Sequence, residues 1–323
     1  MPEIFSTHPL HPAITARLTA AATYRVASEP TPEAILAEGT GATVLIVRAP
    51  IPAEYFARSK HLRAAVRHGA GLDMIPVGAA TGAGVLVANV PGANATTVAE
   101  HVIFAAIGLL RQFRAIDAAL RGSGWNAGRA FSDHGCDLSG RRLGLLGFGN
   151  IGQALHRIAQ GFAMPVAATT RRPETLPAGV QPLSLDDLVA WSDVLVLCCP
   201  LTDQTRGAIS AARIAMMKPG AVLINVSRGP IVDTEALIDA LQARRIAGAA
   251  LDLFDTQPLP PTSPLWALDN VILTPHMAGI TADSMLRMGN GAADEALRVL
   301  AGGLPVNFCN PEVLPAYRAR FPA

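Results

Sequence analysis

The sequence predicts an α/β protein made of two doubly wound parallel-sheet domains. Short apolar runs rich in Val, Ile and Leu alternate with helical patterns along nearly the whole chain. A Gly/Ser-rich stretch at residues 121–140 is a boundary signal between two such series. The length of 323 residues exceeds the roughly 250–300 residues that one hydrophobic core usually organises.

The first series contains short apolar strands, which is typical of parallel strands buried on both faces. Strands are expected at Tyr24–Ala27, Ala42–Val47, Leu62–Arg67 and Val85–Asn89. Helical patterns lie between them, near Pro12–Ala22, Pro32–Glu38, Ala53–Ser59 and Ile75–Gly82. A long apolar helix is then expected at Thr97–Arg114.

The second series begins at Arg141 and ends in a Pro/Asn-rich tail. Its strands are expected at Arg142–Leu146, Pro165–Thr170, Val194–Cys198, Ala221–Val226, Gly248–Leu253 and Val271–Thr274, with a last helix at Ala282–Leu300. Open α/β sheets bind ligands beyond the carboxyl ends of their strands, so the active site is expected in the cleft between the two domains.

Composition excludes several classes of function. A formal net charge of +1 provides no field to attract nucleic acid or an anionic membrane. The four cysteines (Cys136, Cys198, Cys199 and Cys309) show no CxxC spacing, so we expect no metal site and no disulfide framework. The N-terminus lacks signal-peptide features, and the longest apolar helical stretch is far shorter than the ~20 residues of a membrane span. We expect a cytoplasmic protein.

The motif Gly147-Phe148-Gly149-Asn150-Ile151-Gly152 predicts a dinucleotide site. It follows the apolar strand Leu143–Leu146 and opens the helix Gln153–Ala159. The first glycine makes a tight turn, the second lets the backbone approach a pyrophosphate, and the third lets helix and strand pack closely. The alternative is a simple glycine-rich turn, but the strand-to-helix context favours binding.

The end of the next strand indicates which dinucleotide binds. An NAD site usually has an Asp or Glu there, ~20 residues after the glycines, to bond the ribose 2′-hydroxyl. This strand ends in Thr170, Arg171 and Arg172, with no carboxylate. Because guanidinium groups bind phosphates well, we expect NADP in preference to NAD, unless both arginines are ordinary surface charges.

Further motifs closely resemble the D-isomer-specific 2-hydroxyacid dehydrogenase family, over essentially the whole chain and in order. They are 225–229 (NVSRG), 250–254 (ALDLF) with 257–260 (QPLP), 274–279 (TPHMAG), 69–73 (GAGLD), 97–101 (TVAEH) and 200–202 (PLT). The resemblance implies a flavodoxin-like substrate domain, residues 1–100 plus 284–323, and a Rossmann cofactor domain, residues 101–283. It also implies a homodimer.

The resemblance implies roles for individual residues. Arg228 would bind and polarise a 2-oxo acid, His276 would be the acid/base, and Asp252 would bond the nicotinamide amide. The backbone around Ala70 and Gly71 would hold the substrate carboxylate. The cofactor site would also include His276, Cys199, Pro200, Val226 and Gly279.

Elementary chemistry supports these roles. Reduction of a carbonyl needs a hydride at carbon, a proton at oxygen and a positive group facing the developing alkoxide. Arg228 is permanently charged and follows an apolar strand, and His276 follows another, so both are expected at carboxyl ends of strands. A histidine is the usual proton donor near neutral pH. From spacing alone, a structural salt bridge is the more common role for an arginine such as Arg228, and a loop position is the more common one for a histidine such as His276; the resemblance favours the catalytic roles.

Gln257 stands where the family normally has a glutamate paired with its catalytic histidine. A glutamine can orient the imidazole but carries no charge, so we expect a lower pKa for His276 than in the usual members. Asp255, two residues earlier, is a less favourable candidate for the carboxylate that would pair with His276. A glutamine–histidine pair also occurs in the formate dehydrogenases of the superfamily, so formate oxidation is a second function compatible with the sequence.

Two more functions are compatible with the same motifs. They are a phosphoglycerate dehydrogenase and a non-catalytic, dinucleotide-binding regulator. The substrate is expected to be glyoxylate or hydroxypyruvate. Arg48 either binds a second anionic group on the substrate or is a solvated loop residue.

Overall fold

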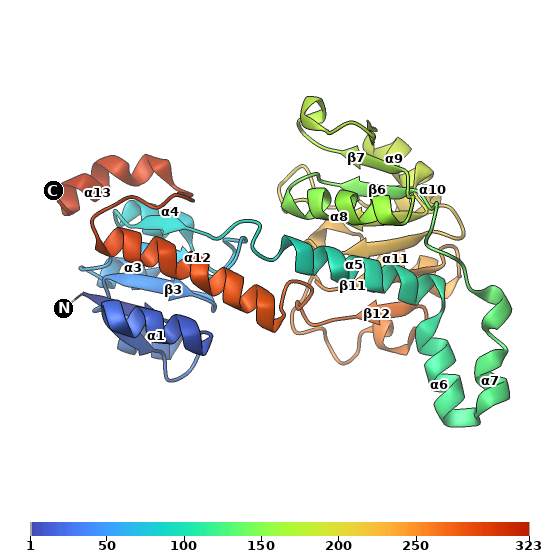
Figure 1. The fold of residues 1–323 in the computed structure, drawn as a ribbon, viewed down its shortest axis with the longest axis horizontal. Coiled ribbons are helices and arrows are strands. Elements are labelled where there is room, and N and C mark those ends of the chain that lie inside the picture. Colours follow the sequence, from blue (N-terminus) through green and yellow to red (C-terminus); the bar gives the residue numbers. More distant parts are fainter. Residues whose placement is uncertain (1, 323) are drawn as a thin grey trace. The chain divides into compact units, whose positions relative to one another are not determined.

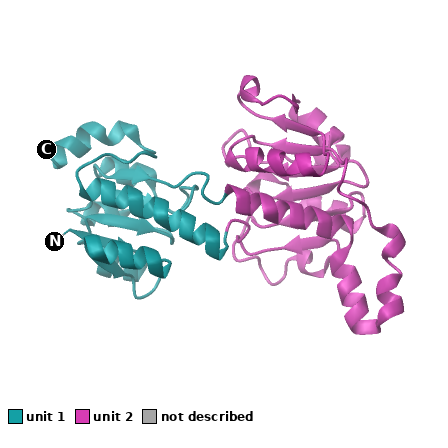
Figure 2. Cartoon of the chain, viewed as in Figure 1, with its two compact units in different colours: residues 1–94, 280–323 teal, residues 95–279 magenta. Residues whose placement is uncertain are grey.

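The chain forms two compact units in the computed structural model, which describes residues 2–322 (Figure 2). The first unit ends at Asn94 and resumes at Ile280, and the second is Ala95–Gly279. The sequence analysis placed the two domain boundaries after residues 100 and 283. In the structure each boundary lies a few residues earlier in the chain, after residues 94 and 279. One reason is that α5 (Ala95–Leu110) packs from its first residue to its last in the core of the second unit.

The first unit is built on a five-stranded parallel sheet with the order β2-β1-β3-β4-β5. The strands are β1 (Glu3–Ser6), β2 (Thr23–Val26), β3 (Val44–Val47), β4 (Ala64–Arg67) and β5 (Leu86–Ala88). This order is that of flavodoxin-like folds, which confirms the predicted fold class. β1 was not predicted from the sequence, because it is only four residues long and directly follows the N-terminus.

Helices cover both faces of this sheet (Figure 1). Residues of α1 (Pro12–Ala21), α12 (Ala282–Leu300) and α13 (Leu314–Arg320) pack with Val44 and Ile46 of β3. Residues of α2 (Pro32–Gly39), α3 (Glu54–Arg58) and α4 (Val77–Gly82) pack with the alternate residues Leu45 and Val47. Side chains two apart share a face, so these are the two sides of the sheet.

The second unit is built on a seven-stranded parallel sheet with the order β12-β11-β10-β9-β6-β7-β8. The strands are β6 (Leu143–Leu146), β7 (Val166–Thr169), β8 (Val180–Pro182), β9 (Val194–Leu197), β10 (Val222–Asn225), β11 (Gly248–Leu251) and β12 (Val271–Leu273). Counted from β6, this is the Rossmann order 3-2-1-4-5-6 with one further strand, again as predicted. β8 was missed because it is a three-residue edge strand that contains a proline.

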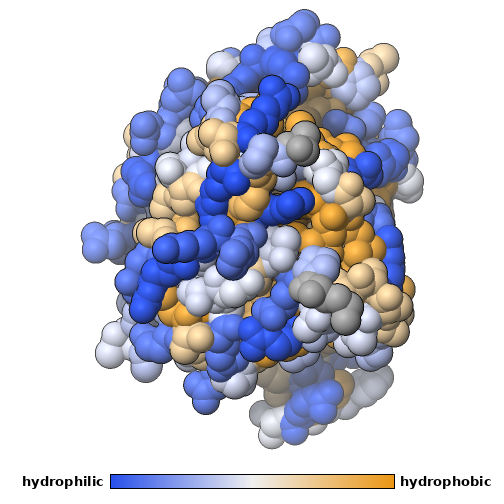
Figure 3. All heavy atoms as spheres, turned by 90° about the vertical axis from the view of Figure 1, so that its left-hand side faces the viewer, coloured by the Kyte–Doolittle hydropathy of each residue, from blue (hydrophilic) through white to orange (hydrophobic). Residues whose placement is uncertain are grey.

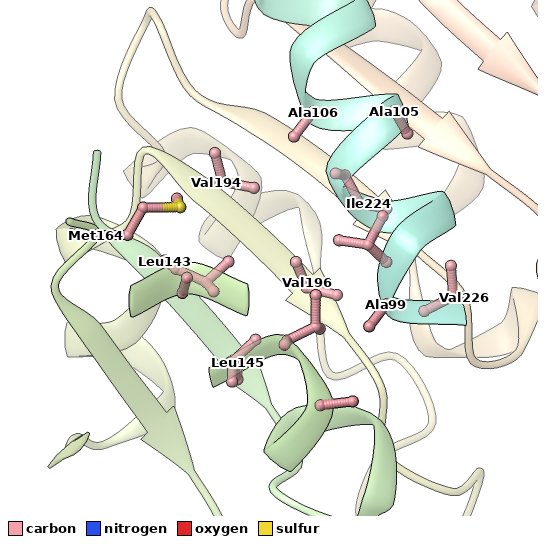
Figure 4. Packing of buried hydrophobic residues seen from close by; sticks show 14 of the residues in the cluster. Ala99, Ala105, Ala106, Leu143, Leu145, Met164, Val194, Val196, Ile224 and Val226 are labelled. Atoms are coloured by element: carbon pink, nitrogen blue, oxygen red, sulfur yellow. The ribbon is translucent and has the colours of Figure 1, made fainter. Parts of the chain in front are cut away.

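Two helical layers cover the second sheet. α5 and α8 (Asn150–Gly161) lie on one face, and α9 (Leu185–Trp191), α10 (Ala211–Met216) and α11 (Thr234–Gln242) lie on the other. Figure 4 shows Ala99, Ala105 and Ala106 of α5 packed over side chains of β6, β9 and β10. Such small side chains let a helix lie close to a sheet.

The Gly/Ser-rich stretch at residues 121–140 lies inside the second unit, so the boundary expected there is wrong. It contains the end of α6 (Phe113–Ser123) and all of α7 (Trp125–Arg129), which pack as a helical hairpin. The helix expected up to Arg114 ends at Leu110, because Gln112 takes a left-handed φ of 51° and turns the chain into α6.

The surface is mixed in character. The face drawn in Figure 3 is largely hydrophilic, with smaller hydrophobic areas between the polar side chains. Over residues 2–322, no helix combines the length and the apolar composition needed to cross a membrane.

Candidate active site

The glycine turn after β6 accepts no other residue at its first position. Gly147 has a φ of 103°, which is a conformation that favours glycine. A Cβ there would lie 2.8 Å from the backbone nitrogen of Cys199 and 3.0 Å from the carbonyl carbon of Cys198. The turn is therefore pressed directly against the end of β9.

The other two glycines of the motif have different surroundings. A Cβ on Gly152 would lie 3.0 Å from the Gly147 carbonyl oxygen, so this glycine lets α8 pack onto the turn. A Cβ on Gly149 would meet no atom within 4 Å, so the space before the α8 N-terminus is open. The positive end of the helix faces that space, which fits a pyrophosphate. The side chains of Phe148 and Ile151 pack back onto the core.

β7 ends beside this turn, and the Gly147 N–H donates to the Thr169 carbonyl oxygen at 2.9 Å. Arg171 and Arg172 follow, and both are exposed. The Arg172 N–H donates to Thr170 Oγ1 at 3.4 Å. Neither guanidinium forms an ion pair with any residue in the range 2–322. Two positively charged side chains that form no ion pair within residues 2–322 therefore follow the strand that ends beside the glycine turn.

Arg228 lies after β10, just before the short 3-10 turn η3 (Gly229–Ile231). The buried Asn225 side chain organises this segment: its Nδ2 donates to the Arg228 carbonyl oxygen at 2.9 Å, and its Oδ1 accepts from the Ser227 N–H at 3.0 Å. Arg228 Nη1 donates to the Ser227 carbonyl oxygen at 2.6 Å. A buried amide therefore fixes the backbone that carries the guanidinium.

The turns after β10 and β11 pack backbone against backbone. A Cβ on Gly229 would lie 2.1 Å from the Phe254 carbonyl carbon and 2.3 Å from the Asp255 nitrogen. The position of the Arg228 segment is therefore set by the segment that follows β11, and only glycine permits this approach.

A single buried carboxylate holds the turn that carries His276. Asp252, which is 3% exposed, follows β11. Its carboxylate accepts hydrogen bonds from the Thr274 hydroxyl at 2.6 Å, the Met277 N–H at 2.8 Å and the Ala278 N–H at 3.0 Å. Its carbonyl oxygen accepts the His276 N–H at 2.9 Å. His276 has a left-handed φ of 54° and is exposed.

Gln257 is exposed, and its Nε2 donates to the Phe254 carbonyl oxygen of the same loop at 3.3 Å. Asp255, the less favoured substitute for a histidine partner, instead accepts a hydrogen bond from the Thr234 hydroxyl at 2.6 Å. Its carboxylate is therefore engaged with the start of α11.

The remaining residues expected at the cofactor site lie at neighbouring chain positions. Cys199 and Pro200 follow β9, Val226 follows β10, and Gly279 is the last residue of the second unit. The Ser227 hydroxyl donates to the Cys199 carbonyl oxygen, which ties the ends of β9 and β10 together. Burial raises the pKa of the Cys199 thiol, so this group is uncharged.

In the first unit, the turn at 68–71 has all of its carbonyl groups engaged in hydrogen bonds. All four carbonyl oxygens accept hydrogen bonds, at distances of 2.7–3.1 Å. The donors are the Arg67 guanidinium, the Asn89 side chain and the Val90 N–H. The N–H groups of Ala70 and Gly71 donate to no residue in the described part of the chain. Such a turn suits an anion such as a carboxylate.

Sequence reasoning missed the residues that hold these turns. They are Arg67, Asn89, Asn225 and Thr274. Each is a polar residue at or just beyond the end of an apolar strand, and that position was the signal available in the sequence. It indicates an edge residue, but not which neighbouring turn the side chain will bond.

Comparisons with known proteins agree with this architecture. The family model described as D-isomer specific 2-hydroxyacid dehydrogenase, NAD binding domain, matches residues 103–278. The glyoxylate reductase of Korarchaeum cryptofilum is 35% identical over 277 residues, which cover 84% of this chain and 83% of that protein. The D-3-phosphoglycerate dehydrogenase of Mycobacterium bovis is 35% identical over 309 residues, or 94% of this chain. The match spans only 57% of that longer relative.

A solved structure resembles the chain over nearly its full length. It is the NADPH-dependent glyoxylate/hydroxypyruvate reductase of Sinorhizobium meliloti, in complex with NADP and malonate. The TM-score is 0.84 at 28% sequence identity, and the match covers 97% of each chain.

Proposed function

The chain belongs to the D-isomer specific 2-hydroxyacid dehydrogenase family of NAD(P)-dependent oxidoreductases, and we propose that it reduces a small 2-oxo acid such as glyoxylate or hydroxypyruvate. One observation carries the proposal. Arg228, Asp252 and His276 follow three neighbouring strands of one sheet, β10, β11 and β12, whose end turns are bonded or packed to one another.

Each residue has a role that its chemistry allows. The bound nicotinamide supplies the hydride. Arg228 polarises the substrate carbonyl and stabilises the negative charge that develops on its oxygen. His276 donates the proton to that oxygen, and the N–H groups of Ala70 and Gly71 hold the carboxylate. Asp252 positions His276, and about one of its four lone-pair directions is left for the nicotinamide amide.

We propose NADP as the preferred cofactor, with its 2′-phosphate bound by Arg171, Arg172 and the Thr170 hydroxyl. The exposed, unpaired guanidinium groups beside the glycine turn support this. Each charge-assisted bond contributes about 1.5–3 kcal/mol. We therefore expect replacement of both arginines by alanine to lower the NADPH/NADH ratio of kcat/KM at least tenfold. Arg157→Ala, on the exposed side of α8, is the control and should leave the ratio unchanged.

We propose that Gln257 orients the imidazole of His276 without charging it, so that ketone reduction favours lower pH than in members with a glutamate. Gln257→Glu should move the pH profile of kcat/KM upward. An unmoved profile would remove Gln257 from the mechanism. The same glutamine favours a second candidate function, formate oxidation, because formate yields a hydride without proton transfer.

We further propose that the chain forms a homodimer through α5, α6 and α7. These helices carry large exposed apolar side chains, with Phe104 57%, Phe113 56% and Trp125 71% exposed. Light scattering should give twice the monomer mass, and Trp125→Ser combined with Phe113→Ser should shift the protein towards the monomer. A monomeric wild-type protein at micromolar concentration contradicts this interface.

The test of the function is the absorbance of the reduced cofactor, with NADPH and NADH in parallel, against a panel of 2-oxo acids. One further reaction contains formate and the oxidised cofactor. Oxidation of NADPH by a 2-oxo acid supports the proposal. Signal only with formate moves the function to formate oxidation, and no signal in any reaction favours a non-catalytic dinucleotide-binding regulator.

A further inference from the structure

The loop after β11 carries two side chains that differ mainly in charge. Asp255 is a carboxylate and Gln257 is a neutral amide, and both are exposed, two residues apart. Gln257 is the proposed partner of the His276 imidazole. A carboxylate in that place would favour the charged imidazole, whereas an amide would not. The protonation of His276 therefore depends on which of the two side chains the loop presents to it.

Packing fixes the start of this loop more firmly than its middle. At the start, Gly229 packs closely against the backbone at Phe254 and Asp255. Beyond that contact the loop forms one wall of a pocket of about 280 Å³, which is lined mainly by apolar side chains of α11 and of the loop, among them Leu237, Leu253 and Leu259. Residues in the wall of a pocket have no protein atoms packed against them on that side. Polar contacts must therefore set the position of the loop middle.

The main polar contact comes from Thr234, the first residue of α11. Its hydroxyl donates to Asp255 Oδ2 at 2.6 Å. The N–H groups of residues 255–257 donate to no residue in the described part of the chain. The Gln257 amide bonds within the loop, to the Phe254 carbonyl oxygen at 3.3 Å. Within residues 2–322, it is thus the Thr234 hydroxyl that ties the loop middle to a helix.

The other ionisable groups near this loop lie on neighbouring segments. They are two carboxylates at the start of α11, a carboxylate after β11, the guanidinium after β10 and an imidazole of α5, namely Asp233, Glu235, Asp252, Arg228 and His101. Asp233 caps α11 by accepting the Ala236 N–H at 3.1 Å, and Asp252 accepts three hydrogen bonds from the His276 turn. Asp255 differs from these carboxylates because it shares its loop with Gln257 and is held by a single hydroxyl.

We propose that Thr234 is a positioning residue, which holds the Asp255 carboxylate at the start of α11 so that the loop presents the neutral Gln257 amide to His276. This rests on the proposed function, in which Gln257 orients that imidazole. Without the Thr234 hydroxyl, the Asp255 carboxylate loses its hydrogen bond and is able to turn towards the imidazole. A carboxylate there stabilises the charged imidazole, so the proton needed for reduction stays bound up to a higher pH.

The test compares the pH profiles of kcat/KM for the best 2-oxo acid. Thr234→Val removes the hydroxyl and keeps the shape of the side chain, and it should move the high-pH side of the profile upward by on the order of one pH unit. Thr234→Ser keeps a hydroxyl and should retain the wild-type profile. Thr262→Val is the matched control, because Thr262 lines the same pocket and its hydroxyl forms no hydrogen bond among residues 2–322.

A second substitution shows whether the shift comes from Asp255. Asp255→Asn alone should leave the profile at its wild-type position, since its carboxylate is held away from the imidazole. Combined with Thr234→Val, it should cancel the upward shift. The first of these two measurements decides the matter if Thr234→Val does not fold, because a downward shift in Asp255→Asn alone would mean that this carboxylate already acts on His276.

Three other results overturn the positioning role. They are an unmoved profile in Thr234→Val, a loss of activity at every pH without a shift, and a shift that persists in the double variant. If the wild type reduces no 2-oxo acid, the proposed function fails by itself. The role of Thr234 is then judged by NMR titration of the His276 imidazole, whose midpoint should rise in Thr234→Val and return to the wild-type value in the double variant.

Discussion

The carboxyl ends of the two sheets differ in how completely their polar groups are bonded. In the second unit, Asn225 and Asp252 are buried, and each accepts or donates several hydrogen bonds within its own unit. In the first unit, His8 and His68 follow β1 and β4, and the buried atoms His8 Nδ1 and His68 Nε2 have no hydrogen-bond partner among residues 2–322. The groups proposed for the chemistry in the second unit are thus held in place by hydrogen bonds, whereas the strand ends of the first unit leave buried polar atoms unbonded.

The largest effect is expected when the positive charge of Arg228 in the second unit is removed. Arg228→Ala should lower kcat/KM for the best 2-oxo acid on the order of 10²–10³-fold, because the alkoxide loses its stabilising group. Steady-state kinetics measures this, with the exposed Arg206→Ala as control. A loss below tenfold would show that the preorganised turn after β10 does not carry the proposed chemistry.

The second prediction concerns the buried histidine of the first unit. Burial first, and then the charges of Arg48 and Arg67, lower the pKa of His68 to about 4 from 6.5. Below pH 6.5 the unfolded chain binds a proton that the folded chain does not, so stability decreases as the pH falls from 6.5 towards 4. The difference is on the order of 3 kcal/mol over that window.

Hydrogen exchange of the β4 amides at pH 7 and pH 4.5 measures this loss within the first unit. His68→Gln should reduce the dependence on pH, since it removes the titrating group. The same dependence in wild type and variant would mean that another group is responsible.

The third prediction concerns the close backbone packing in the second unit between the turns that follow β10 and β11. Gly229→Ala places a Cβ 2.1 Å from the Phe254 carbonyl carbon, so one of the two turns must move. We expect a loss of roughly 1–3 kcal/mol in the free energy of unfolding, together with reduced activity. Gly220→Ala, whose Cβ would meet nothing within 4 Å, should be close to neutral. Equal denaturant midpoints for the two variants contradict the packing argument.

The smallest effect is expected for a variant that tests whether Asp252 positions His276. Thr274→Val removes one of the three hydrogen bonds to its carboxylate and keeps the shape of the side chain. A loss of about 1 kcal/mol corresponds to a roughly fivefold lower kcat, with KM for the cofactor unchanged. If KM for the cofactor rises instead, the bond serves cofactor binding and not the position of His276.

Much of the fold follows from local patterns. The strands that were predicted correctly are apolar runs bounded by turn residues, and the glycine motif joins β6 to the first turn of α8. The failures have local reasons. β8 is short and contains a proline, and the Gly/Ser-rich stretch at 121–140 resembles a linker because its helices are held by each other. The α6 start depends on the left-handed Gln112, which no propensity predicts.

Residue type and short-range spacing are enough to find the two α/β series, the dinucleotide motif, the arginines after β7 and the candidate pair Arg228 and His276. Two contacts can be seen only in the folded chain: Asp252 holds the His276 turn, and Gly229 packs on the backbone at Phe254. These contacts join segments that are far apart in the chain, and their bonding depends on the register of the strands.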